Sequence, residues 1–156
     1  MPRTHIICLG KLKEQYLKDA VSEYTKRLGK YTNLTISELA HQKTAPNLSP
    51  SETEIVKIKE GERVLTKLAQ LKGYTVFPLA LCGKNVTSQE FAMLINQNPQ
   101  SVFIIGASHG LSKDVLATGS PISFSSLTFS HQIMRIILLE QIYRGYKILN
   151  NEPYHK

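Results

Sequence analysis

The last four residues of the chain, Pro153-Tyr154-His155-Lys156, combine a phenol, an imidazole and a cation. An imidazole titrates near neutral pH and can accept or donate a proton, so histidine is a common general base. Chain ends are usually frayed and carry little chemistry. The tail is therefore either part of a reactive site or a disordered end, and its residues alone favour the disordered end.

A small polar loop lies before the long helix that leads to this tail. Residues Phe124–Phe129 read Phe-Ser-Ser-Leu-Thr-Phe, and the pattern predicts an amphipathic helix over Ser130–Asn150. Such a loop can surround a purine, with backbone groups at its edge and Leu127 or Phe129 over its face. The alternative is a plain helix-entry loop capped by Ser130. The residues leave both interpretations open.

Two glycine motifs follow predicted strands, where open α/β sheets bind their ligands. Gly83-Lys84 resembles the end of a phosphate-binding P-loop. However, Pro78 stands where that motif needs glycine, and Asn85 stands where it needs serine or threonine. We therefore exclude nucleoside triphosphate binding.

The second motif, Gly106-Ala107-Ser108-His109-Gly110, matches the G-x-S-x-G elbow of serine hydrolases. Asp114 comes only six residues after Ser108, within the same local element, and there is no His-Gly-Gly-Gly run for an oxyanion hole. A serine hydrolase stays a minor alternative. A glycine-flanked turn that lets backbone amides approach a ligand explains the motif better.

The composition predicts a single domain spanning residues 1–156, with 42% hydrophobic residues and a net charge of +7. The positive charge is spread along the chain, which favours a polyanionic partner such as a nucleic acid over a membrane. The apolar runs are too short for a membrane span or a signal peptide, so we expect a cytoplasmic protein. Cys8 and Cys82 are expected to be buried thiols, and no metal-ligand spacing is present.

The chain alternates strand-like and helix-like segments. Predicted strands are Thr4–Leu9, Leu34–Leu39, Tyr74–Leu81, Val102–Ile105 and Ile122–Phe124. Predicted helices are Leu12–Leu28, Ser51–Leu71, a short one from Thr87 or Ser88 to Asn96, and Ser130–Asn150. This order predicts an α/β domain with a mostly parallel sheet and helices on both faces.

Local signals add detail to the first two helices. Tyr16, Ala20, Tyr24 and Leu28 recur at i, i+4 and predict one buried face. Gly29 is expected to end that helix in a left-handed conformation. In the second helix, Ser51 and Glu54 predict a capping box, and Gly61 interrupts the helix at a cost of up to ~1 kcal/mol.

Four stretches together resemble the bacterial SPOUT-class enzymes that methylate N3 of a pseudouridine in 23S ribosomal RNA. They are Leu9–Glu14 with Tyr24 and Lys26–Leu28, Leu79 with Gly83-Lys84, Gly106–Leu111, and Ser123–Arg135 with Glu140, Tyr143-Arg144 and Tyr154–Lys156. The likeness covers essentially the whole chain, in order. The His-Gln-x-Met-Arg segment and the tail are its most specific parts.

The resemblance implies a SPOUT fold with a trefoil knot in its C-terminal half, S-adenosylmethionine as methyl donor, and a homodimer with its active site at the subunit interface. Its substrate would be 23S ribosomal RNA of the large subunit. It also implies three sets of site residues. The cofactor would contact Leu79, Gly106, Phe124, Ser125, Ser126, Leu127, Thr128 and Phe129. The catalytic residues would be Arg135, Tyr154 and His155. The RNA would contact His131, Arg144, Lys11, Lys13 and Lys156.

The sequence departs from the family pattern at two positions. The family usually has a second glycine where Ala107 stands, and often a proline where Ser130 stands. Alanine is small, so we expect only a modest change in the loop. Ser130 is expected to replace the proline by capping the helix.

The implied chemistry requires that a protonated imide nitrogen lose its proton. His155 or Tyr154 would take or orient this proton, and Arg135 would stabilise the negative charge that develops on the base. The sequence does not choose between His155 and Tyr154. Two alternatives from other classes remain, a ribosome-binding protein without catalytic activity and the serine hydrolase.

Overall fold

Five parallel strands form one sheet in the computed structural model, which describes residues 1–156. The strands are β1 (Arg3–Leu9), β2 (Asn33–Leu39), β3 (Thr75–Asn85), β4 (Gln100–Ile105) and β5 (Ile122–Ser123). Their order across the sheet is β2-β1-β4-β3-β5, and every neighbouring pair is parallel. The predicted α/β class with a parallel sheet is confirmed. The trefoil knot stays a prediction.

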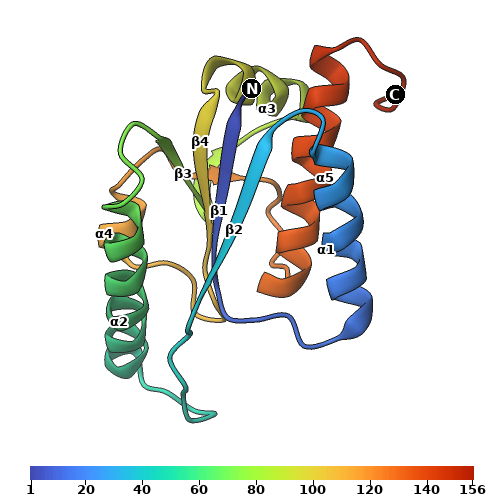
Figure 1. The fold of residues 1–156 in the computed structure, drawn as a ribbon. Coiled ribbons are helices and arrows are strands. Elements are labelled where there is room, and N and C mark those ends of the chain that lie inside the picture. The colour runs from blue at the N-terminus through green and yellow to red at the C-terminus, as the bar shows by residue number, and fades with distance from the viewer.

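Helices cover both faces of the sheet (Figure 1). On one face α5 (His131–Leu149) packs against both α1 (Gln15–Leu28) and α3 (Ser88–Gln97). On the other face lie α2 (Pro50–Leu68) and the short α4 (Lys113–Leu116). None of these helices combines the length and the apolar character that a membrane crossing requires.

Alternating side chains of the central strands fill two separate cores. In β4, Phe103 and Ile105 pack toward α3 and α5, whereas Val102 and Ile104 pack toward α2 and α4. Successive strand side chains point to opposite faces, so a strand that is buried on both faces needs a continuous apolar run. The uninterrupted run Val102–Ile105 is therefore the sequence signal of the strand at the centre of the sheet.

The first helix differs from its prediction in its start, its buried face and its end. It begins at Gln15, three residues later than predicted, and it buries Leu17 and Leu28, whereas Tyr16 is 69% exposed. A strict four-residue spacing drifts away from the buried stripe, because a helix has 3.6 residues per turn. Gly29 has φ −58° and is right-handed, since its N–H closes a tight last turn instead of reversing the chain.

The second helix begins earlier than its prediction. Ser49 and Glu52 form the capping box, not Ser51 and Glu54, and both reciprocal hydrogen bonds are present. Pro50 occupies the first helical position, where its fixed φ suits the helix and its missing N–H costs nothing. The predicted helix began at Ser51, so its predicted start was one residue too late.

A close helix contact explains the glycine in the middle of α2. The helix ends at Leu68 rather than Leu71, and it buries Gly61 against the start of α4. A Cβ on Gly61 would lie 2.5 Å from the Ser112 hydroxyl oxygen. The loss of helix propensity is therefore offset by close packing of the two helices on this face.

Strand β3 is longer than predicted and leaves the central sheet at its end. Its first half pairs with β4, and its register against β5 shifts between Leu79 and Lys84. Cys82 lies in this departing segment and is exposed, which contradicts the expectation of a buried thiol. Cys8 is buried in β1 as expected, and burial raises its pKa to about 11.

The predicted cap of the last helix is confirmed. The Ser130 hydroxyl accepts a hydrogen bond from the Gln132 N–H, so serine provides a side-chain acceptor where the family often has proline. The helix then runs to Leu149, and the tail that follows folds back beside it (Figure 1). The amino end of α5 thus lies near the loops that follow the strands, and its carboxyl end carries the tail.

Candidate functional site

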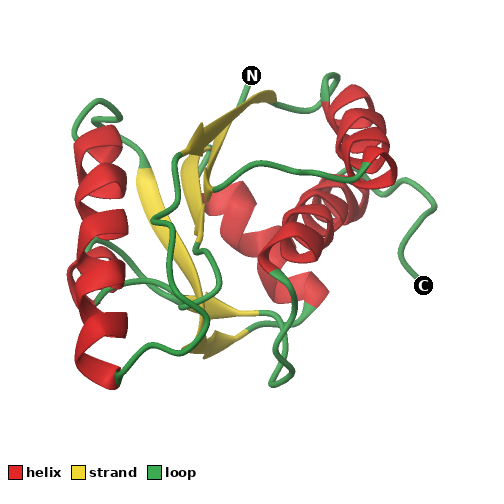
Figure 2. Cartoon of the chain, turned by 90° about the horizontal axis from the view of Figure 1, so that it is seen from below, coloured by secondary structure: helices red, strands yellow, loops and turns green.

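A cavity of about 650 Å³ opens at the carboxyl ends of β3, β4 and β5. Figure 2 looks toward this end of the sheet, from which the loops after the strands emerge. Its walls come from Leu79–Leu81, Ile105–Gly110, Ile122–Ser125, Leu127–His131 and Met134. Its volume is typical of small-molecule and cofactor sites, which are mostly apolar with a few convergent polar groups.

Seven of the eight residues expected to contact a cofactor line this single cavity: Leu79, Gly106, Phe124, Ser125, Leu127, Thr128 and Phe129. Ser126 lies outside the lining. His131, expected to contact RNA, also reaches the cavity wall. The structure thus brings together residues that come from three different strand ends.

The loop between β5 and α5 is shaped by its own serines. The Ser123 hydroxyl donates to the Ser125 carbonyl at 2.9 Å, and the Ser125 hydroxyl accepts from the Leu127 N–H at 3.0 Å. Phe124 packs edge-on against Phe91 of α3, with 5.1 Å between ring centroids. Leu127 itself is 68% exposed. The loop is therefore held at its base, and an apolar side chain is left free at the cavity mouth.

A tight turn forms the opposite wall. The Gly110 N–H donates to the Ala107 carbonyl at 3.0 Å, and Gly110 has φ +81°. A Cβ on Gly106 would lie 2.9 Å from the Gly110 backbone, so only glycine fits there without opening the turn. The turn exposes backbone groups to the cavity, as the glycine motif predicted.

The structure gives no support to the hydrolase alternative. Ser108 is exposed on the turn, and no hydrogen bond joins it to a histidine. The histidines that do form side-chain hydrogen bonds are His5, to Ser37, and His155, to Gln89 and Arg144. Without a histidine in contact, a serine hydroxyl lacks the base that activates it.

Two histidines meet beside the cavity across Gly10, and the sequence identified only one of them. Rings of His131 and His41 both lie within 4 Å of the position that a Cβ of Gly10 would take. Burial lowers the pKa of His131, and the charges of Arg135, His41 and Lys13 lower it further. His41 follows β2 by two residues, so its place at the carboxyl end of a parallel strand was the signal that could have identified it.

Acidification is expected to destabilise the fold through two histidines. Burial is the main cause that lowers the pKa of His131 and of His5 below 6.5. The unfolded chain therefore binds protons at a higher pH than the folded chain, and the free energy of unfolding should fall as the pH drops through 6.5. Urea denaturation across that range measures the slope. His131→Gln should make the slope shallower, and an unchanged slope would contradict the assignment to His131.

Arg135, expected to act on the RNA base, lies inside the protein rather than on the cavity wall. Its guanidinium is 2% exposed, pairs with Glu38 and donates to the Gly10 carbonyl at 3.2 Å. Its Nε is buried without a partner. In this structure Arg135 ties α5 to β2 and to the loop after β1.

Arg135→Ala should lower the free energy of unfolding by about 3 kcal/mol, because it leaves the Gly10 carbonyl and Glu38 without their donor. Urea denaturation measures this change. Arg27→Ala is the matched control: it removes an exposed ion pair with Glu23 and should cost below about 1 kcal/mol. Equal losses in both variants would mean that Arg135 has no special structural role.

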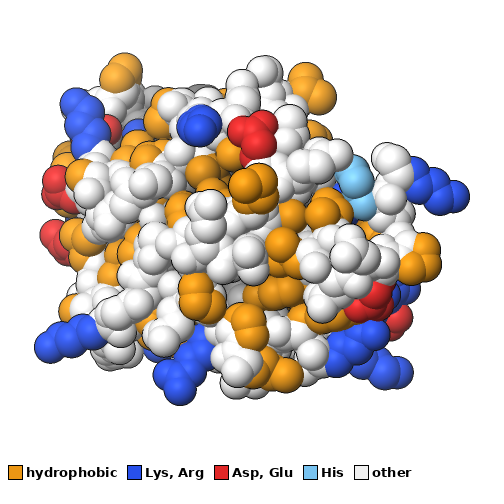
Figure 3. Space-filling view, turned by 90° about the horizontal axis from the view of Figure 1, so that it is seen from above, with side chains coloured by type: hydrophobic (Ala, Val, Ile, Leu, Met, Phe, Trp, Pro, Cys, Tyr) orange, Lys and Arg blue, Asp and Glu red, His pale blue; other side chains and the backbone are white.

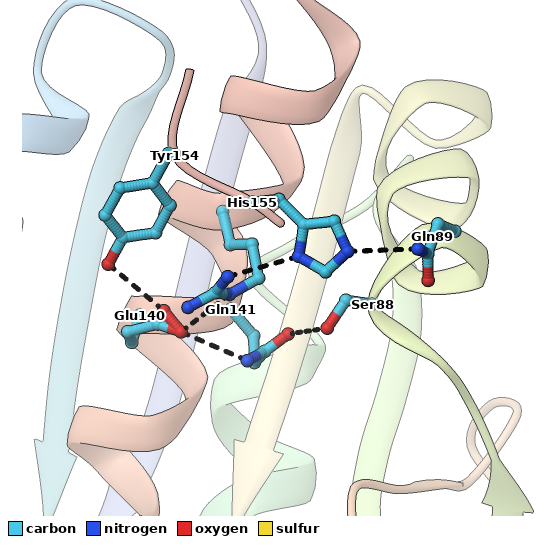
Figure 4. A network of polar contacts seen from close by, with 7 residues as sticks. Ser88, Gln89, Glu140, Gln141, Tyr154 and His155 are labelled. Atoms are coloured by element: carbon cyan, nitrogen blue, oxygen red, sulfur yellow. Dashed lines mark hydrogen bonds and ion pairs between the residues drawn. The ribbon is translucent and has the colours of Figure 1, made fainter. Parts of the chain in front are cut away.

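The tail is held in a network of polar contacts on α5 and α3 (Figure 4). His155 contacts Arg144 through Nδ1 at 3.1 Å and Gln89 through Nε2 at 3.0 Å. Glu140 accepts from Arg144 Nε at 3.0 Å and from the Tyr154 hydroxyl at 3.4 Å. We call these five residues the tail network. Gln89 was not identified from the sequence, since nothing local links it to the chain end.

The start of the tail is fixed separately. Glu152 accepts hydrogen bonds from the Lys147 ammonium at 2.8 Å and from the Tyr31 hydroxyl at 2.9 Å. Hydrogen bonds from Lys147 and Tyr31 lower the pKa of Glu152. The tail is thus tied to the body at both ends of its short length, in contrast to a frayed terminus.

The remaining cations expected to bind RNA are on the surface. Lys11 and Lys13 are exposed in the loop after β1, and the charge of Lys13 reaches His131 at the cavity wall. Lys156 is exposed at the chain end. The structure therefore separates the expected RNA-binding cations between the loop after β1 and the region of the tail.

Two solved structures share this fold. TrmJ from Z. mobilis ZM4 matches with a TM-score of 0.53 and 15% identity, over 100% of this chain and 73% of that one. The A. aeolicus TrmH/SpoU tRNA modifying enzyme matches with a TM-score of 0.56 and 12% identity, over 100% and 82%. At these identities the likeness concerns the fold alone.

Sequence comparison is more specific. The chain is 49% identical to the "Ribosomal RNA large subunit methyltransferase H" of Clostridium beijerinckii, covering 97% of this chain and 98% of that protein. It is 46% identical to the protein of the same name from Carboxydothermus hydrogenoformans, with the same coverage. A family model described as "Predicted SPOUT methyltransferase" matches residues 2–155. The chain therefore belongs to the SPOUT methyltransferase family.

Proposed function

We propose that this protein transfers a methyl group from S-adenosylmethionine to N3 of a pseudouridine, position 1915 of 23S ribosomal RNA. The observation that carries the proposal is the meeting of the Gly106–Gly110 turn and the Phe124–Phe129 loop in one cavity. The names of the two relatives, large-subunit ribosomal RNA methyltransferases, support the same substrate class.

The cavity walls suit the proposed cofactor. Ten of the nineteen lining residues are hydrophobic, which fits the faces of an adenine ring, and the two backbone turns offer polar groups to its edge and to the ribose. Leu79 and Leu127 are the side chains we assign to the purine. Bound there, S-adenosylmethionine would supply an electrophilic methyl group, and its positively charged sulfur would become a neutral thioether when the methyl–sulfur bond breaks.

His155 is our candidate for the proton acceptor. The N3 imide must lose its proton before or during attack, and an imidazole nitrogen with a free lone pair can accept that proton. Burial, and next the charge of Glu140, raise the pKa of Tyr154 to about 12. The phenol therefore keeps its proton at neutral pH, and we assign it a role as a hydrogen-bond donor in the tail network.

We further propose that the active enzyme is a homodimer in which the tail of one subunit serves the cavity of the other. Arg144 lies 13 residues after His131 on α5, which at 1.5 Å per residue separates them by about 20 Å. The tail is thus far along the helix from the cavity of its own chain. Exposed apolar side chains near the cavity, Leu81, Leu127, Phe129 and Ile133, would be covered by a partner.

We assign the Lys and Arg side chains at the margins of the surface that carries α3 and the chain end to contacts with RNA phosphates. In Figure 3 hydrophobic side chains are scattered over this face, and Lys and Arg side chains lie mostly around its edge. With a net charge of +7, we expect RNA affinity to fall steeply with salt because bound phosphates release counterions.

The test uses ribosomes from a strain without the gene, incubated with purified protein and S-adenosylmethionine. Mass mapping of 23S RNA should show one added methyl group at the proposed pseudouridine only. No cofactor binding by calorimetry, together with no methylation of any RNA, would favour the alternative of an RNA-binding protein without catalytic activity. Methylation at another nucleotide would refute the proposed specificity, and fluorophosphonate labelling of Ser108 would favour the hydrolase.

A further inference from the structure

Both ring nitrogens of His155 have polar neighbours, and those neighbours restrict its protonation. Arg144 Nη1 lies 3.1 Å from Nδ1, and the side-chain amide nitrogen of Gln89 lies 3.0 Å from Nε2 (Figure 4). A guanidinium can only donate hydrogen bonds, and it stays charged at any physiological pH. The hydrogen bond to Glu140 raises the pKa of Arg144 further. Nδ1 must therefore be the acceptor and carries no proton.

The second contact then fixes the tautomer. A neutral imidazole with a bare Nδ1 has its proton on Nε2, so Nε2 must donate. The Gln89 amide must present its oxygen, because an amide nitrogen on Nε2 would require a ring with no proton at all. The two ends of an amide have nearly the same shape, and a half-turn about the last bond exchanges them. After this half-turn the amide oxygen of Gln89 takes the place of its nitrogen beside Nε2. Gln89 thus serves as the acceptor for the Nε2 proton.

The rest of the tail network, together with Gln141 and Ser88, holds this arrangement in place. Glu140 orients Arg144 through Nε, and the guanidinium lies 4.8 Å above the centre of the Tyr154 ring. Gln141 donates to Glu140 at 3.1 Å and accepts from the Ser88 hydroxyl at 2.8 Å. The charged and titratable groups around His155 are therefore Arg144 and Glu140 of α5 and Tyr154 of the tail, and α3 contributes the neutral Gln89.

The network also reaches the wall of the cofactor loop. Ser88 and Gln141 line a second cavity of about 170 Å³, which shares Phe124, Ser125 and Phe129 with the main cavity. The side chains that orient His155 are therefore connected, through Gln141 and Ser88, to the Phe124–Phe129 loop that we assign to the cofactor of the same chain.

We propose that Gln89 and Arg144 are positioning residues that hold His155 as the neutral Nε2–H tautomer, so that Nδ1 is the nitrogen that takes the proton from N3 of the base. This rests on the proposed function. Arg144 covers the Nδ1 lone pair in the free protein, and an RNA phosphate that draws Arg144 away uncovers it. The proton passes from N3 to Nδ1, His155 becomes a cation, and it returns to neutral by releasing a proton to water.

The test compares three variants at exposed positions of α3. Gln89→Leu removes the acceptor, Gln89→Glu keeps an acceptor and adds a charge, and Gln97→Leu is the matched control at the other end of the helix. Nitrogen NMR of the His155 ring, assigned by comparison with His155→Ala, reports the tautomer. Steady-state kinetics at several pH values report kcat and KM.

We expect the Nε2–H tautomer in the wild type, in Gln89→Glu and in Gln97→Leu, and a mixture in Gln89→Leu. In Gln89→Leu kcat should fall about tenfold with KM little changed, a smaller effect than loss of a buried histidine-orienting carboxylate. In Gln89→Glu the pH at half-maximal kcat should rise, because the carboxylate stabilises the cationic ring.

Two results would overturn the inference: a proton on Nδ1 in the wild type, or an unchanged tautomer and kcat in Gln89→Leu. Failure of the proposed function is distinguishable from both. A wild-type protein that methylates no RNA would refute that function and would leave the tautomer measurement readable. If the wild type is active and Gln89→Leu keeps the wild-type tautomer and kcat, only the role of Gln89 is rejected, and the proposed function stands.

Discussion

His155→Ala should lower kcat for methyl transfer about 10²–10⁴-fold, the usual contribution of a positioned general base. The cofactor dissociation constant should stay within about twofold, because His155 lies outside the cavity lining. Tyr154→Phe should cost less, since its hydroxyl makes one long contact of 3.4 Å with Glu140. Single-turnover assays with ribosomes and calorimetry with S-adenosylmethionine measure the two effects separately.

Full activity of His155→Ala would remove the tail from the catalytic mechanism. A parallel loss of cofactor affinity would mean that the tail acts on binding instead. Glu152→Gln is a useful companion variant, because it weakens the anchor of the tail at Lys147 and Tyr31 without touching the imidazole. Its kcat should lie between those of the wild type and His155→Ala.

Gly106→Val should weaken S-adenosylmethionine binding by about 10- to 100-fold. A Cβ there would lie 2.9 Å from the Gly110 backbone and 3.1 Å from Leu111, so the turn that forms one cavity wall must open. Overpacking of this kind typically costs about 1–3 kcal/mol. Calorimetry measures the affinity, and circular dichroism shows that the variant is folded.

Gly29→Ala is the matched control for that substitution. Gly29 has right-handed backbone angles and is exposed at the end of α1, far from the cavity lining, so alanine should leave cofactor affinity unchanged. Wild-type affinity in Gly106→Val would show that the ligand does not approach this turn, and the assignment of the cavity to the cofactor would fail.

The two damaging substitutions together test the proposed dimer. A mixed dimer of Gly106→Val and His155→Ala subunits has one intact cavity and one intact tail, on different chains. If the tail serves the partner's cavity, these two parts form one working site and activity returns. If each tail serves its own chain, every site is defective and the mixed dimer stays inactive.

Local signals were sufficient to predict most elements of the fold. Apolar runs such as Val102–Ile105 marked the strands, the Ser130 cap marked the start of the last helix, and one of the two residues proposed for the start of the short helix, Thr87, is its cap. The errors were also local in origin. Pro50 was left outside the predicted helix, and Gly29 was interpreted as a left-handed cap, because each residue type is compatible with both conformations.

The candidate site was only partly accessible to sequence reasoning. The loop Phe124–Phe129 and the Gly106 turn were identified, since each carries its pattern within a few residues. Arg135 was predicted to be a catalytic residue, which stays a prediction, and its burial against Glu38, 97 residues away, was not predicted. No periodicity within α5 reports what lies opposite a given side chain.

The sequence by itself determined the α/β class, the elements and the loop chemistry, because helix turns, strand alternation and caps are set by neighbours a few residues apart. The tertiary structure decided which of these parts meet. It placed His41 beside His131, and it placed Gln89 on the ring of His155, 66 residues away. Those contacts follow from the strand order β2-β1-β4-β3-β5 and from the packing of α3 against α5. Strand order and helix packing depend on burying both faces of the sheet at once, which no local segment encodes.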